Sequence, residues 1–557
     1  MTVNRYFFTF LPNYVTLLLA GLWCLLLAAC LGEEVALPGG ETPGATTLPV
    51  SFNSFVGEVK SGTQSGATGG TRSGRGMTRA TYPEGVATGV TDLDGLKASG
   101  FGVMAVYTGT ADYSASTGST FNFMWNQQVT WDDALGDDYV TRWTYSPVKY
   151  WPNDHAPADD QDNDSGNNPA TGSGADGDKV SFLGYAPYVA ATTPAEGFDV
   201  KDDDGDDADS EPDHDGIVKL TANTSTVSEA SLYYRTSLTA PFDAEQSVDL
   251  LWAVPQLDRT KMDGAGYTGG TVDMVFRHAL SLFTISVQGL FDHVDNADAT
   301  TTYPDDREMY TKILVDTVEI KESPLFTEGT MYLAPDPVNA TVPKWAVAED
   351  KTADIKLEGE EINPTIWNRY LDGTYQKYWD EADAGVTSPA NLKSLLQLSD
   401  QNHDGVENEA DALALFNQLP KGVSHTEVAL NNTEYDAVAD AYKYKYYMVV
   451  PNKEYREAHP TTSAVKVRMV YYVITYDPRL TLVKTGYPKY FSIVKNDVTA
   501  TFSNFSFEAN KKYKLRLQPG LTSAKFDVTV VDNWDTPLTL DPEVVDWYTT
   551  VMEYDVE

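Results

Sequence analysis

The sequence predicts an all-β protein built from antiparallel β-sandwiches. Several segments alternate apolar and polar residues with a period of two, the pattern of a strand with one face in a core and the other in water. Helical patterns are scarce, and the clearest one, at residues 388–420, predicts a helix–loop–helix. Strands that face water on one side form antiparallel sheets, and many such strands predict sandwiches.

The predicted strands run through most of the chain. The first is LPVSFNSFVG at residues 48–57, where Val50, Phe52 and Phe55 are the apolar positions. The other clear strands are expected at residues 101–107, 178–188, 271–289 (as two strands), 463–477, 511–518 and 523–534. His278 lies beside strand residues, so we expect it to be a structural, hydrogen-bonded histidine rather than a ligand.

Length and charge limit the classes of protein that fit. The chain has 557 residues, of which 40 are basic and 81 acidic, giving a formal net charge of −41. The length predicts two or three domains, and the composition places a break near residues 290–312. The negative charge disfavours nucleic acid and anionic membrane surfaces as partners. Polar or acidic stretches at residues 57–80, 154–179 and 199–215 are expected to be loops.

Residues 1–29 have the layout of a secretory signal peptide, with Arg5 ahead of an apolar run. The run ends in Leu-Ala-Ala-Cys at Cys30, which resembles the lipobox of bacterial lipoproteins. A buried or membrane-spanning helix is the alternative, although the run is short for a span. The lipobox predicts that Cys24 is removed and that Cys30 is acylated, with palmitate as the expected chain. The product would be an outer-membrane lipoprotein.

One loop has the spacing of calcium ligands. Oxygen-bearing side chains fall at relative positions 1, 3, 5, 9 and 12, a glycine at position 6 permits a sharp turn, and a carbonyl is available at position 7. The candidate ligands are Asp400, Asn402, Asp404, the Val406 carbonyl, Asn408 and Asp411. The spacing resembles thrombospondin type 3 and dockerin loops and predicts a structural Ca²⁺ site. A solvated acidic turn is the alternative.

Catalytic signatures are missing from the sequence. It contains no HExxH, GxSxG, P-loop or GxGxxG motif, and its histidines lack metal spacing. We therefore expect that the protein is not an enzyme and has no catalytic residues. The aromatic residues Trp143, Tyr145, Tyr150 and Trp151 have two interpretations, packing within a sandwich or a stacking platform for sugars.

Several segments, in order along the chain, resemble the fimbrillins of Bacteroidales. These are FNFMWNQQVTW at residues 121–131, WTYSPVKYWPND at 143–154, VSFLGYAPY at 180–188, VDMVFRHALSLFTISVQG at 272–289, YYMVVPNKEY at 446–455 and NKKYKLRLQPGLTSAKFDVTVVDNWD at 510–535. The resemblance implies two transthyretin-like β-sandwich domains. The expected organisation is a signal at 1–29, a lipidated start with first strand and cleavable linker at 30–80, domains at 81–295 and 296–540, and a tail at 541–557. The helix–loop–helix insertion at 388–420 in the second domain, which contains the candidate calcium loop, departs from the family pattern.

The resemblance also implies a function, that of a type V pilus subunit supporting adhesion. Such a subunit reaches the outer membrane as a lipoprotein, is cut after an arginine by a trypsin-like protease, and polymerises when a neighbour's strand replaces its first strand. Arg72, Arg75 and Arg79 are the candidate cleavage sites, and residues 544–556 are a candidate donor strand. The choice among the arginines and between stalk, tip and accessory roles stays open. The alternative is a surface glycan-binding lipoprotein that remains anchored through Cys30.

Overall fold

The structure of the chain is a computed structural model. The described residues are 49–56, 91–113, 119–135, 142–152, 178–190, 198–199, 215–261, 271–290, 310–358, 361–363, 365–366, 405–430, 435–436, 441–442, 444–461, 463–481, 488–503, 505–521, 524–533 and 552–555. By internal contacts the chain divides into Met1–Thr47 and Leu48–Glu557, and every described residue lies in the second unit.

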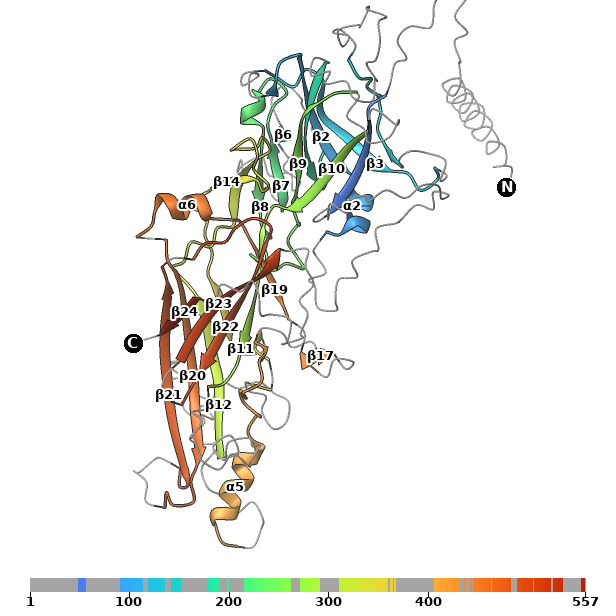
Figure 1. Ribbon diagram of the computed structural model, residues 1–557. Coiled ribbons are helices and arrows are strands. Elements are labelled where there is room, and N and C mark those ends of the chain that lie inside the picture. The colour runs from blue at the N-terminus through green and yellow to red at the C-terminus, as the bar shows by residue number, and fades with distance from the viewer. Residues whose placement is uncertain are drawn as a thin grey trace, which may run out of the picture. The chain divides into compact units, whose positions relative to one another are not determined.

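Strands dominate the described residues, which confirms the all-β class (Figure 1). The helical elements within the described ranges are short: α2 (Leu93–Ser99), α5 (Glu409–Gln418), α6 (Lys453–Ala458) and the 3₁₀ turn η2 (Val227–Glu229). Among the described residues, none of the helices has the length and apolar character needed to cross a membrane.

A seven-stranded sheet forms the first part of the fold, in the order β1-β10-β9-β5-β2-β3-β4. Its strands are β1 (Ser51–Val56), β10 (Thr271–His278), β9 (Leu251–Arg259), β5 (Lys179–Ala186), β2 (Phe101–Gly109), β3 (Met124–Trp131) and β4 (Trp143–Thr144). The two edge strands, β1 and β4, contact each other. The sheet therefore curls around one of its faces.

A five-stranded sheet accompanies it, in the order β14-β13-β8-β7-β6. Its strands are β14 (Lys344–Val347), β13 (Glu328–Tyr332), β8 (Ser231–Arg235), β7 (Gly216–Leu220) and β6 (Phe198–Asp199). A hydrophobic cluster joins the two sheets, with Trp252 and Tyr185 from the seven-stranded sheet and Trp345 from the five-stranded sheet.

Two further sheets build the second part of the fold. One contains β16 (Val428–Ala429), β11 (Ser281–Val287), β22 (Lys511–Pro519), β23 (Ala524–Asn533) and β24 (Met552–Asp555), with β19 (Tyr446–Val449) also paired to β11. The other contains β15 (Ile355–Glu358), β12 (Thr311–Ile320), β20 (Val465–Tyr476) and β21 (Phe491–Phe502). Two short strands, β17 (Tyr435–Asp436) and β18 (Ala441–Tyr442), pair with each other.

The buried hydrophobic residues form three clusters. The largest lies between the two sheets of the second part, the next joins the two sheets of the first part, and the third fills the curl of the seven-stranded sheet. Because clusters lie on both of its faces, the centre of the seven-stranded sheet is covered on both sides, as the uninterrupted burial of Phe101–Val106 shows.

Two predictions about the sheets need correction. The expectation of purely antiparallel sheets is wrong, because β1 pairs with β10 and β11 pairs with β22 in parallel. The sheets also do not separate at the predicted domain boundary between residues 295 and 296, because β11 joins the second part while β13 and β14 pair within the first. Partners so distant along the chain are brought together by long crossovers, which local sequence patterns do not reveal.

Candidate functional site

The first strand, β1, is the element that the predicted strand exchange would replace. Alternating residues of β1 divide into a face toward the third cluster and a face away from it. The strand pairs in parallel with β10 from Ser51 opposite Thr271 to Val56 opposite Phe276. Among the described residues, β10 is the one strand paired with it, so β1 is an edge strand.

The outward face of β1 makes polar contacts with β10. The Ser51 and Thr271 hydroxyls lie 2.7 Å apart, and the Asn53 side-chain amide donates to the Asp273 carboxylate at 3.1 Å. Such partly exposed hydrogen bonds contribute about 1 kcal/mol each. They fix the register of the strand more than they hold it in place.

The inward face of β1 is anchored by one aromatic ring. Phe52 is completely buried and meets Phe101, Tyr145 and Phe182 edge-on, at centroid distances of 6.3, 5.4 and 5.9 Å. Burial of a phenylalanine side chain stabilises a fold by about 1.5–3 kcal/mol, and each aromatic pair adds about 0.5–1.5 kcal/mol. Among the described side chains of β1, Phe52 is therefore the main hydrophobic contact with the rest of the chain.

Residues 145–150 hold the start of β1 from the other side. The Val50 N–H donates to the Lys149 carbonyl at 2.9 Å, and the Tyr145 hydroxyl donates to the Val50 carbonyl at 2.8 Å. The Lys149 N–H in turn donates to the Tyr145 hydroxyl at 3.2 Å. Burial raises the pKa of Tyr145 to about 12, so the hydroxyl remains a donor well above neutral pH. The segment acts as a clasp on Pro49 and Val50.

The chain is anchored again after the predicted linker. The candidate cleavage residues Arg72, Arg75 and Arg79 lie outside the described residues, between β1 and Thr91. The Thr91 N–H donates to Asp249 Oδ2 at 2.7 Å, and the same oxygen lies 2.8 Å from His278 Nδ1. Asp249 and His278 are both buried, so the expected structural role of this histidine is confirmed. The two ends of the linker therefore have separate non-covalent anchors.

A sugar platform made from the four aromatic residues at 143–151 is contradicted by their burial. Trp143 and Trp151 are only 5% and 3% exposed, and they pack on Phe101 and Phe182 within the third cluster. Tyr145 belongs to the clasp, which leaves Tyr150 as the member that faces solvent, with 52% of its surface exposed. The packing interpretation of these aromatics is confirmed.

The end of the chain forms a strand within its own fold. β24 lies at an edge of its sheet and pairs antiparallel with β23, from Met552 opposite Val528 to Asp555 opposite Lys525. The rest of the candidate donor segment, residues 544–551 and 556, lies outside the described residues. A short pairing at a sheet edge leaves this segment dependent on one neighbouring strand.

The described part of the calcium loop is the start of helix α5. Asn408 is the N-cap, and its side chain accepts from the Ala410 N–H at 2.8 Å, while the Asn408 N–H donates to Asp411 Oδ2 at 2.8 Å. Asn408 Nδ2 also donates to the Val406 carbonyl at 3.0 Å. Gly405 has the expected left-handed backbone, with φ of 84°.

These contacts bear on whether calcium fits. Hydrogen bonds already engage one oxygen each of Val406, Asn408 and Asp411, so the geometry of this part serves a helix cap. The other candidate ligands, Asp400, Asn402 and Asp404, lie outside the described residues. The same holds for residues 388–404 of the expected helix–loop–helix as a whole. The exiting helix is confirmed, and calcium stays a prediction. Among the described residues, there is no group of three or more acidic, histidine or cysteine side chains arranged to hold a metal.

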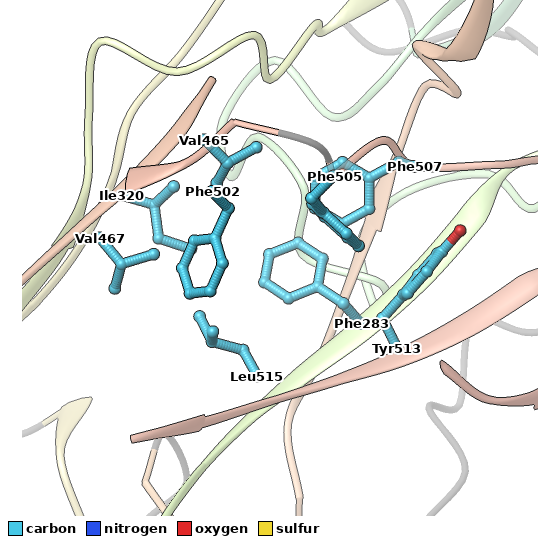
Figure 2. Close-up of a pocket in the computed structure, with 9 residues that line it drawn as sticks. All are labelled: Phe283, Ile320, Val465, Val467, Phe502, Phe505, Phe507, Tyr513 and Leu515. Carbon is cyan, nitrogen blue, oxygen red and sulfur yellow. The ribbon is translucent and has the colours of Figure 1, made fainter. Parts of the chain in front are cut away.

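An apolar cavity lies in the second part of the fold (Figure 2). Its volume is about 20 Å³, and its lining residues are Phe283, Ile320, Val465, Val467, Phe502, Phe505, Phe507, Tyr513 and Leu515. A space of this size, lined by apolar side chains, is a small gap in the packing between the two sheets.

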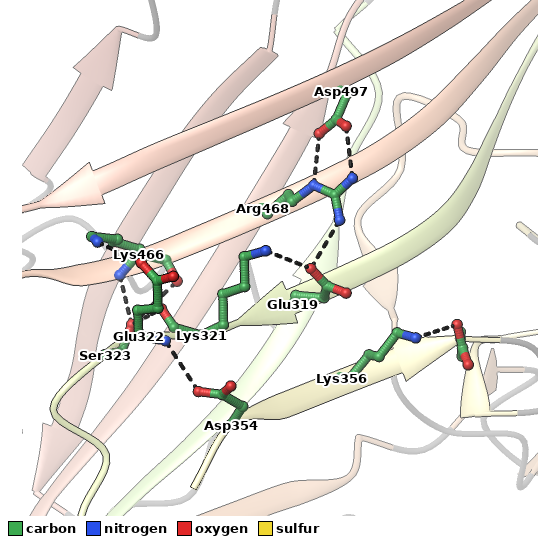
Figure 3. Close-up of polar contacts among 10 residues, drawn as sticks. Glu319, Lys321, Glu322, Ser323, Asp354, Lys356, Lys466, Arg468 and Asp497 are labelled. Carbon is green, nitrogen blue, oxygen red and sulfur yellow. Dashed lines mark hydrogen bonds and ion pairs between the residues drawn. The ribbon is translucent and has the colours of Figure 1, made fainter. Parts of the chain in front are cut away.

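Charged residues on the outer face of the β12–β20–β21 sheet pair with one another (Figure 3). Arg468 donates to both oxygens of Asp497, at 2.8 and 2.7 Å, and to Glu319 at 2.9 Å. The guanidinium lowers the pKa of Asp497, because it stabilises the carboxylate. These ion pairs link the neighbouring strands β12, β20 and β21.

Comparison with known proteins finds solved structures of low similarity to this chain. No family model matches the chain, and no match was found among curated proteins. The chain is similar to the crystal structure of a "putative cell adhesion protein" from Bacteroides uniformis, with 11% identity, a TM-score of 0.29, and coverage of 78% of this chain and 91% of that one. A counterpart from Parabacteroides distasonis has 10% identity, a TM-score of 0.31, and coverage of 86% and 92%.

A fimbrial protein from Bacteroides ovatus is similar over 47% of this chain and 40% of its own, with 13% identity and a TM-score of 0.14. These TM-scores are too low to establish a shared fold. Function must therefore be judged from the residues of this chain.

Proposed function

We propose that the protein is a structural subunit of an adhesive surface fibre, a pilus or fimbrium, which assembles by strand exchange at the β1 position. In this proposal the chain is exported as a lipoprotein anchored through Cys30 and is cut after Arg72, Arg75 or Arg79. Removal of β1 then opens a groove along β10, and a strand of a second copy fills it.

The observation that carries the proposal is the position of β1. It is an edge strand that buries an aromatic anchor, and it is followed by a linker whose far end is held independently by Asp249. A cut in the linker would leave β1 bound by non-covalent contacts alone. Its loss would expose the unpaired edge of β10 together with the Phe52 pocket, and an incoming strand would satisfy both.

The donor in this proposal is the segment at residues 544–556. β24 supports the choice, because part of this segment already forms a strand at a sheet edge. To act on a neighbour it would leave β23, where four residues of it are paired. No observation favours the alternative of an anchored glycan-binding protein, since its proposed tryptophan platform is buried.

An arginine-specific protease tests the proposal. Lipid-free protein without the signal is digested, and the products are run on SDS gels without heating. We expect ladders resistant to SDS, because exchanged strands bury the Phe52 pocket across subunits. A control with all of Arg72, Arg75 and Arg79 changed to Gln should stay uncut at the linker and remain monomeric. Wild-type protein that is cut at the linker, loses β1 and remains monomeric in size-exclusion chromatography would contradict the proposal.

A further inference from the structure

The inward face of β1 contains one residue that does not fit its surroundings. Val50, Phe52 and Ser54 share this face and are all buried, and Ser54 is 8% exposed. Ser54 lies opposite Met274 of β10, which is completely buried in the third cluster. A hydroxyl has thus been placed in the apolar interior, between the Phe52 anchor and the end of the strand.

The Ser54 hydroxyl has no hydrogen-bond partner among the described residues. A buried hydroxyl without a partner loses its hydrogen bonds to water and gains nothing in exchange, so it weakens the element that carries it. Ser51, on the opposite face of the same strand, has its hydroxyl 2.7 Å from that of Thr271. The two serines of β1 therefore act in opposite directions on how firmly the strand is held.

We propose that Ser54 weakens the binding of β1 in its groove, and that the Ser54 position is a subsite for an apolar side chain of the strand that replaces β1. The inference rests on the proposed function, because it takes the replacing strand to come from a second copy of this chain. It adds which position of the groove drives the exchange and what the incoming strand must carry there.

The tail of the chain has the sequence that such a subsite requires. If Tyr554 takes the aromatic pocket of Phe52, the residues two positions away fall at the Val50 and Ser54 positions. These are Met552 and Val556, and both are apolar. In the parallel orientation Val556 reaches the Ser54 subsite, and in the antiparallel orientation Met552 does. The match therefore holds for either strand direction.

A nicked protein separates this inference from the proposal about assembly. A recognition sequence for a site-specific protease is inserted within residues 57–90 of the full chain, and release of the β1 fragment is followed after the cut. Ser54→Ala removes the hydroxyl alone, so we expect release to become about tenfold slower, which corresponds to about 1.4 kcal/mol. The matched control Ser51→Ala removes a satisfied hydroxyl and should leave release unchanged or faster. Release from Ser54→Ala that is as fast as from wild type would overturn the inference.

A synthetic peptide of residues 544–557 tests the requirement on the incoming strand. We expect it to displace the nicked β1 from wild-type protein, and to do so about tenfold more slowly from Ser54→Ala. The peptide with Met552→Ser and Val556→Ser places a hydroxyl in the subsite in either direction, and it should displace β1 at least tenfold less efficiently. Equal displacement by the two peptides would also overturn the inference. If the release and displacement rates change as expected but arginine-cleaved full-length protein stays monomeric, the assembly proposal fails and the Ser54 assignment stands.

Discussion

Phe52 links the stability of the first sheet to the retention of β1. Its ring is completely buried among Phe101, Tyr145 and Phe182. We expect Phe52→Ala to lower the free energy of unfolding of the intact chain by about 3–5 kcal/mol, because it leaves a cavity in the third cluster. Denaturant titration measures the loss. Phe52→Leu, which keeps most of the volume, should lose less than half as much, and equal losses in the two variants would show that the ring is not the anchor.

The Tyr145 clasp gives a second prediction for single residues. Its hydroxyl donates to the Val50 carbonyl and accepts from the Lys149 N–H. Tyr145→Phe keeps the ring against Phe52 and removes these bonds, so β1 should be destabilised by about 1 kcal/mol. Hydrogen exchange at the Val50 and Lys149 amides reports the change, and unaltered protection of both amides would contradict the clasp.

Lys312 makes the contact between β12 and α5 dependent on pH. Its ammonium donates to the Leu419 carbonyl at 2.7 Å and lies 5.0 Å from the centre of the Phe416 ring. Burial lowers the pKa of Lys312 from 10.5 to about 8. Between these values the unfolded chain binds more protons than the folded chain, so the contribution of this residue to stability increases as the pH rises.

The comparison of wild type with Lys312→Met isolates this effect. The stability of the wild type relative to Lys312→Met should increase from pH 8 to about 9.5, as thermal melts at closely spaced pH values would show. Buried tyrosines such as Tyr113, whose pKa burial raises to about 12, destabilise both proteins similarly above about pH 10. A difference that does not change with pH would contradict the effect of burial on Lys312.

At the level of single elements, variants at the start of α5 can distinguish calcium binding from helix capping. If Ca²⁺ occupies the predicted loop, a chelator should lower the melting temperature, because a ligand that binds only the folded state stabilises it. Asp404→Ala should abolish the response to chelator while leaving the cap formed by Asn408 and Asp411. Asp411→Ala should lose about 1 kcal/mol even with chelator present, because it breaks that cap. Identical melting of the wild type with and without chelator would rule out a stabilising metal.

Local alternation predicted the strands well where one face of a strand is covered. In β20 the alternating residues from Val465 to Val473 are all buried, as expected. From Val470 onward the intervening positions are buried as well, because the strand end is covered on both faces. Strand β21 was not predicted from the sequence, because many of its side chains face solvent and it lacks a clear apolar alternation. It contacts β20 partly through charged pairs such as Arg468 with Asp497.

The candidate site was predictable only in part. The apolar pattern of residues 48–57 identified β1, and Val50 and Phe52 are buried as expected. The parallel partner of β1 is 220 residues away, and the clasp residue Tyr145 is 95 residues from Val50. Contacts of such range depend on the whole topology and leave no local signal. The misfit of Ser54 became visible only once its surroundings were known.

At the scale of the whole molecule, the buried hydrophobic residues among those described form three clusters, and the edge strand β1 contributes to the third. The other two clusters contain no residue of β1. Loss of β1 should therefore destabilise the curled seven-stranded sheet and leave the other two clusters intact. This arrangement suits a subunit that must stay folded while one strand is exchanged.

Mass spectrometry of protein assembled on the cell surface tests the account most directly. If β1 is exchanged, peptides covering residues 49–56 should be absent from the assembled fibre, and its subunits should begin immediately after Arg72, Arg75 or Arg79. Fibres whose subunits retain residues 49–56 and a lipidated Cys30 would contradict it, because β1 would then still occupy the groove that the neighbouring strand requires.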